Sequence, residues 1–216
     1  MNKRKIHNKD DWAHFAIGYL RLAELACLEI IEKKHQEKGL ETNFTMEHIY
    51  IPALFNLKHG IEILLKTLGI EFLNKEILDQ SDYSHDIEEI FSRLRKEIRE
   101  ERLKNAVLEF EKKNPDRKGD LSGKEIFDEL ERIVRKYHSL DFLKEKIGTD
   151  YTIKDPDNTA LRYPENNLSI CINYKKLSKK FTKDDVGKSM VESARLETIL
   201  WQLYVLLYEE QLKQLK

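Results

Sequence analysis

The chain contains few of the residues that interrupt helices. Only 8 of its 216 residues are Gly and 4 are Pro, so long continuous elements are expected. It also lacks an excess of either charge, because 38 Lys and Arg stand against 39 Asp and Glu, for a formal net charge of −1. A near-neutral chain has no bulk attraction to nucleic acid, so any such contact requires a local basic surface.

Cysteines and long apolar runs are also scarce. Cys27 and Cys171 are far apart in the sequence, a spacing that fits neither a metal site nor a disulfide framework. The longest uncharged apolar run, 198–208, is too short to cross a bilayer. No apolar signal segment follows the basic residues at 1–5. We therefore expect a cytoplasmic protein with free thiols and no membrane association.

The common signatures of cofactor and catalytic sites are missing too. The sequence has no Gly-rich phosphate loop, no His-Glu-x-x-His, no paired Cys-x-x-Cys and no nucleophile elbow. We therefore predict no cofactor, and the question of an enzymatic activity depends on weaker patterns.

The residues that are abundant favour helix. Lys, Glu, Leu and Ile are good helix formers, and apolar residues recur at helical spacing along most of the chain. In the first helix the predicted apolar stripe consists of Trp12, Phe15, Tyr19, Leu22, Ala23, Ala26 and Ile30. The fold class predicted is mainly α, a bundle of four to five long helices in a single domain over 1–216. The helices are expected over 10–38, 45–69, 84–113, from 122, and over 182–215.

One segment has a different pattern. A turn is expected at 155–158, from Asp-Pro-Asp-Asn. Apolar and polar residues then alternate over 168–174, which is the period of a half-buried strand. We therefore predict a small β-hairpin or single strand near 150–175.

The second helix is apolar on most sides, so its polar residues stand out. His59, Glu62 and Lys66 are spaced i, i+3 and i+7 and therefore share one stripe. Glu62 and Lys66 also have the favourable order for an i,i+4 ion pair.

A His-Asp doublet suggests a metal hypothesis. Helical phosphohydrolases of the His-Asp superfamily hold divalent metal with such residues, and His59, His85, Asp86 and Asp141 have the suitable side chains. The competing interpretation is that His85 and Asp86 occupy the first turn of a helix, where an Asp favours the helix dipole.

Two neighbouring segments carry a family resemblance. Residues 56–69 read Asn-Leu-Lys-His-Gly-Ile-Glu-Ile-Leu-Leu-Lys-Thr-Leu-Gly, and 84–91 read Ser-His-Asp-Ile-Glu-Glu-Ile-Phe. This pair resembles the HEPN family (higher eukaryotes and prokaryotes nucleotide-binding). Leu-Arg-Tyr-Pro at 161–164, before a long final helix, is similar to the longer prokaryotic members. The resemblance covers about 10–95 and 158–210, and the charged helical region around 96–150 is interpreted as an insertion.

The resemblance implies a helical bundle that is often a homodimer. Members include metal-independent RNases of toxin–antitoxin, CRISPR and abortive-infection systems, and non-catalytic partners of nucleotidyltransferases. We therefore expect a protein of prokaryotic defence or toxin–antitoxin type that acts on or binds RNA. The alternative is a dimeric interaction protein that partners a nucleotidyltransferase or another effector. The third hypothesis is the metal-dependent phosphohydrolase.

The catalytic members of that family carry an Arg followed after four to six residues by a His. Only Arg132 and His138 match this spacing. In such a site the Arg stabilises phosphate charge and the His performs acid–base chemistry on a ribose hydroxyl. However, Ile133 follows the Arg where a polar residue is usual, and on a straight helix the pair lies about 120° apart. The competing interpretation is a charged helix end.

A second polar set is the other candidate for the functional groove. By the resemblance, Glu62 and Lys66 line the inner helix beside His59, while Lys66 and Arg162 contact phosphate and Tyr163 stacks on a base. His85 lies at the start of the next helix. The competing interpretation is a buried ion-pair network, with Glu62 bonded to Lys66 and Arg162 and with His85 as a cap, that holds the helices together without chemistry.

Overall fold

The computed structural model shows a mainly α protein. It describes residues 9–32, 49–73, 85–97, 123–147 and 180–214, with 105, 108–109, 111–112, 115, 161 and 177 as isolated positions. All regular structure within these residues is helical, which confirms that the protein is mainly α, as predicted. The strand or hairpin predicted near 150–175 falls outside the described residues, apart from Leu161, which is buried.

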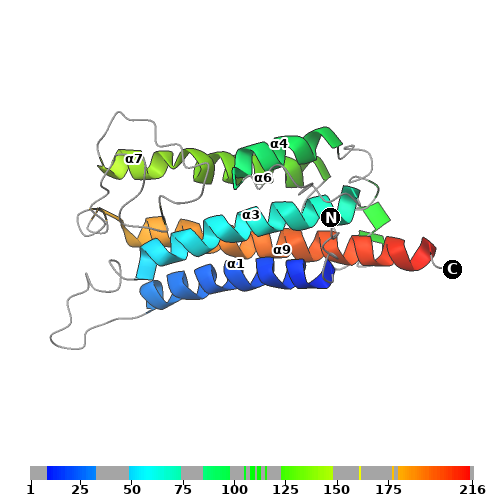
Figure 1. Cartoon of the computed structure of the whole chain (residues 1–216). Coiled ribbons are helices and arrows are strands. Elements are labelled where there is room, and N and C mark those ends of the chain that lie inside the picture. Colours follow the sequence, from blue (N-terminus) through cyan, green and yellow to red (C-terminus); the bar gives the residue numbers. More distant parts are fainter. Residues whose placement is uncertain are drawn as a thin grey trace, which may run out of the picture.

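The helices form two groups on either side of α3. Helix α3 packs against α1 and α9 on one side and against α4 on the other, and α4 in turn contacts α6. Figure 1 shows α4, α6 and α7 above α3, with α1 and α9 below it. The helices are α1 (Lys9–Glu32), α3 (Ile51–Leu73), α4 (Ile87–Glu97), α6 (Gly123–Ser139), α7 (Asp141–Ile147) and α9 (Lys183–Gln214).

The buried face of α1 is only partly the one predicted, because Ala23 and Ile30 of the predicted stripe are buried whereas two larger residues are exposed. Phe15 and Leu22 were assigned to the core stripe, but they are 63% and 55% exposed. The buried face is instead made mostly of small side chains, because α1 approaches α3 closely. A Cβ added at Gly60 of α3 would lie 2.8 Å from the side chain of Leu20. The buried residues of α1 are Ala13, Ala16, Leu20, Ala23, Cys27 and Ile30.

The two ends of α3 follow from local chemistry, with one correction. Pro52 lies in the first turn, where its missing N–H would have no helical partner. The predicted end at Gly69 is wrong, because the helix continues to Leu73. Gly69 is buried, so helix packing there offsets the weak helix propensity of Gly.

Helix α6 belongs to the same hydrophobic core, although it falls in the region interpreted as an insertion. Its apolar residues at helical spacing are buried, among them Ile126, Leu130 and Ile133. The chain then turns at Leu140, whose φ of 50° is unusual for a residue with a side chain. Full burial of the Leu140 side chain holds the chain in this conformation and separates α6 from α7.

Helix α9 begins with a reciprocal cap. The Asp185 carboxylate accepts a hydrogen bond from the Thr182 backbone N–H at 2.7 Å, and the Thr182 hydroxyl accepts one from the Asp185 N–H at 3.2 Å. This capping box confirms the predicted start of the last helix. Among the residues that the structure describes, none of the helices has the length and apolar character needed to cross a membrane.

Candidate functional site

The polar stripe of α3 forms a network around one buried carboxylate. The Glu62 side chain is only 1% exposed, and its carboxylate accepts hydrogen bonds from Lys66 Nζ at 2.5 Å and His85 Nδ1 at 2.9 Å. His59 Nδ1 lies 3.3 Å from the other carboxylate oxygen. Four of the predicted groove residues therefore meet at one point, whereas Arg162 and Tyr163 lie outside the described residues.

The charge on Glu62 is strongly stabilised. Burial by itself raises the pKa of this carboxyl, but hydrogen bonds from His59, Lys66 and His85 outweigh burial and lower the pKa to about 2. Lys66 is also buried. Because this ammonium group is buried against Glu62, it is poorly placed to contact a backbone phosphate. The geometry is that of a buried ion-pair network between α3 and the start of α4.

The residues of the metal hypothesis have separate roles. Asp86 Oδ1 accepts hydrogen bonds from the backbone N–H groups of Glu88 and Glu89 at 2.9 and 3.1 Å, so it caps α4. Asp141 contacts the Ser139 hydroxyl at the start of α7. Within the described part of the chain, no three His, Cys, Asp or Glu side chains are grouped as metal ligands.

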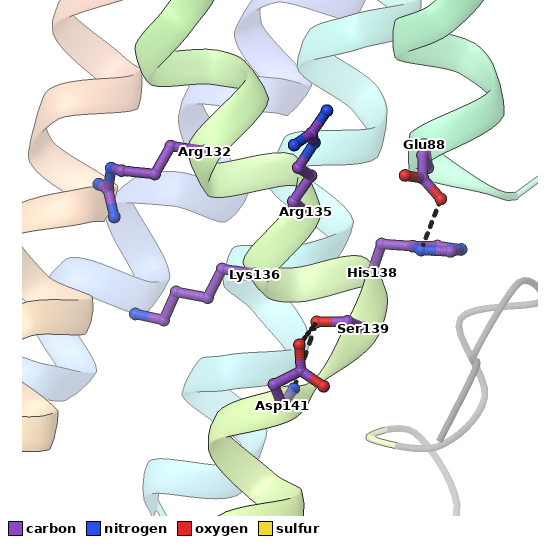
Figure 2. Close-up of a pocket in the computed structure, with 7 residues that line it drawn as sticks. All are labelled: Glu88, Arg132, Arg135, Lys136, His138, Ser139 and Asp141. Carbon is purple, nitrogen blue, oxygen red and sulfur yellow. Dashed lines mark hydrogen bonds and ion pairs between the residues drawn. The ribbon is translucent and has the colours of Figure 1, made fainter. Parts of the chain in front are cut away.

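An open groove crosses the face of α6. It has a volume of about 650 Å³ and combines three cations with a histidine and two carboxylates. Figure 2 shows Arg132 and Lys136 extending toward one side of the helix and His138 toward the other, where it meets Glu88. The groove is lined by Glu88, Arg132, Arg135, Lys136, His138, Ser139 and Asp141.

His138 is held by two carboxylates at the start of α4. Its Nδ1 lies 3.0 Å from the Glu88 carboxylate, and its Nε2 lies 3.4 Å from Asp86. The imidazole is largely buried, with its edge in the groove. His138 therefore ties α6 to the start of α4.

Arg132 is held on the opposite side of α6. Its Nε and one terminal nitrogen contact both oxygens of Glu129 at 2.9 and 3.0 Å, and its other terminal nitrogen contacts Glu192 of α9 at 3.2 Å. These contacts, those to Glu129 first, raise the pKa of Arg132 above its usual range. They account for three of the five N–H donors of the guanidinium group.

Beneath the groove, a buried chain of hydroxyl groups ends on Glu192. The Glu192 carboxylate accepts hydrogen bonds from the Tyr137 hydroxyl at 2.9 Å and Lys136 Nζ at 2.7 Å. Tyr137 and Tyr50 both approach the Ser189 hydroxyl, at 3.5 and 2.9 Å. Burial raises the pKa of both phenols, so they remain neutral hydrogen-bond donors.

The predicted catalytic pair thus lines a single groove but does not converge on one point. Residues six apart in a helix are offset by about 9 Å along its axis and about 120° around it. Arg132 and His138 follow this geometry, and each is drawn further outward by carboxylates on its own side. One phosphoryl group between them would not contact both, whereas an extended strand lying across α6 would.

Several groove residues were not identified from the sequence. Arg135 and Lys136 lie between the predicted pair, and their proximity to His138 on an amphipathic helix was a usable signal. Glu192 gave no such signal, because its role depends on the packing of α9 against α6. Comparison of the chain with family models, curated proteins and solved structures found no match.

Proposed function

We propose that the protein is a HEPN-like module that binds RNA, with the sugar–phosphate backbone lying in the α6 groove. The observation that carries the proposal is the presence of Arg132 and His138 in one open groove together with Arg135 and Lys136. Cations spaced along an accessible surface suit successive phosphates. The family resemblance adds a biological context of prokaryotic defence or toxin–antitoxin type.

The exposure of the cations favours this groove over the Glu62 network. The Arg135 side chain is 69% exposed, so its guanidinium group reaches solvent although it also contacts Glu131. Lys66, by contrast, is enclosed against Glu62. A phosphate can reach Arg135 without disrupting the core. To reach Lys66 it would have to open the packing between the helices.

Binding without cleavage is the expected activity, because Arg132 and His138 diverge. The test is incubation of total cellular RNA with the protein, with and without EDTA, beside Arg132→Ala and His138→Ala. We expect intact RNA in every sample, and retarded migration of a short labelled single-stranded RNA that weakens in Arg132→Ala. Metal-independent cleavage that is lost in both variants would contradict this result and identify the pair as catalytic.

A second candidate function is dimeric interaction with a protein partner, favoured by the exposed apolar side of α1. Phe15, Leu22 and Leu25 fall within about 80° of one another on the helix and are all exposed. An antiparallel pair of α1 helices from two copies would place Phe15 of each opposite Leu25 of the other, since both are five residues from position 20. Analytical ultracentrifugation tests this: Phe15→Ser with Leu22→Ser should yield a monomer, and a wild-type monomer would exclude it.

A further inference from the structure

Glu192 occupies an unusual position beneath the groove. It is a buried carboxylate on α9 that contacts two groove cations at once, Arg132 at 3.2 Å and Lys136 at 2.7 Å. Lys136 Nζ also lies over the rings of Tyr137 and Phe142, 5.2 and 5.4 Å from their centroids. Both cations are therefore held from the protein side while parts of them still line the groove.

The hydrogen-bond donors around Glu192 are arranged in a single order. The Tyr50 hydroxyl donates to the Asp185 backbone oxygen at 3.1 Å, which only accepts, so the Ser189 hydroxyl donates to Tyr50. Tyr137 has one hydroxyl hydrogen, and Glu192 at 2.9 Å is a nearer acceptor than Ser189 at 3.5 Å. Glu192 is thus fixed from below by Tyr137 while it binds both cations.

We propose that Glu192 restrains phosphate binding in the groove by neutralising Arg132 and Lys136. The inference rests on the proposed RNA-binding function. A phosphate that approaches either cation also approaches this carboxylate, and like charges in a partly buried site repel strongly. Glu192 therefore competes with phosphate for the two cations. Its negative charge weakens their attraction for phosphate and so lowers the affinity for RNA.

The test is the affinity of a short fluorescent single-stranded RNA for Glu192→Gln, measured by anisotropy across a salt series. Gln keeps the shape and removes the charge. We expect about tenfold tighter binding at low salt. We also expect the slope of log K against log salt to become steeper by about 0.7 if one more phosphate is engaged. The matched control is Glu197→Gln, because Glu197 is also on α9 but lies beside Arg21 of α1 at 3.8 Å.

Each outcome decides a different question. Affinity of Glu192→Gln equal to or below that of Glu197→Gln, with wild-type RNA binding intact, overturns the inference and leaves the proposed function standing. Absence of RNA binding by the wild type and both variants overturns the two together. If Glu192→Gln does not fold, Glu129→Gln replaces it, because Glu129 is the other carboxylate on Arg132 and is part-exposed. It should also tighten binding, and unchanged affinity there contradicts the inference.

Discussion

The described part of the chain contains two clusters in which a buried carboxylate binds cations, and they differ in what the cations face. Around Glu62, Lys66 is enclosed between helices. Around Glu192, the cations Arg132 and Lys136 also line an open groove. The first arrangement satisfies its charges internally and stabilises packing, whereas the second holds cations at a surface where a ligand reaches them. Residue types alone do not separate the two cases, because both combine Glu with Lys, Arg or His.

The largest expected effect is a loss of stability when the charge of Glu62 is removed. Glu62→Gln leaves Lys66 buried without a countercharge, so we expect a loss of about 3–5 kcal/mol in the free energy of unfolding, measured with urea. Glu89→Gln is the control, because Glu89 forms an exposed pair with Arg93 and should cost less than about 1 kcal/mol. Equal effects in the two variants would show that the Glu62 network does not hold α3 and α4 together.

Acid titration sharpens the same point. The pKa of Glu62 is about 2 in the folded protein against an ordinary 4.5. A lowered folded-state pKa stabilises the protein above pH 4.5, and this contribution is lost as pH falls toward 2. The shift corresponds to about 3 kcal/mol. Urea denaturation between neutral pH and about pH 3 should show a smaller loss in Glu62→Gln than in wild type, and parallel curves would refute the assignment.

A smaller effect is expected beneath the groove. Tyr137→Phe removes a buried donor to Glu192, whose carboxylate keeps Arg132 and Lys136. We expect unfolding to become easier by about 2 kcal/mol, the range for a hydrogen bond to a charged group. RNA affinity should change little, because the charge of Glu192 remains. Tyr50→Phe is the control, since that hydroxyl bonds neutral partners, and a larger loss there would contradict this ranking.

Local sequence patterns predicted the features that depend on residues close together in the sequence. The spacing of His59, Glu62 and Lys66 placed them on one stripe, and the last helix was expected to begin at 182, as the structure confirms. Both features depend on residues within one or two helical turns. The contact of His85 with Glu62 was not predicted, because the expected network gave His85 a capping role and the contact depends on the placement of α4.

Features that depend on packing between distant helices were not predictable. The core face of α1 was assigned correctly at Ala23 and Ile30 but not at Phe15 and Leu22, which are more hydrophobic than the small residues that pack near Gly60. Close approach of two helices favours small side chains, and this approach cannot be predicted from the hydrophobicity pattern of one helix. In the same way, the sequence alone does not distinguish Glu192 from the other charged residues of α9. Only the packing of α9 against α6 brings it into contact with Arg132.

The most direct test of the central claim is the RNA affinity of Arg135→Glu, measured by anisotropy with a short single-stranded RNA. Arg135 lines the groove and is well exposed, so reversal of its charge should not disturb the core. Arg21→Glu is the matched control, because Arg21 is an exposed arginine of α1 with a nearby Glu partner. We expect RNA binding to weaken by about tenfold or more in Arg135→Glu and to change little in Arg21→Glu. Equal affinities for the two variants and wild type would contradict the claim.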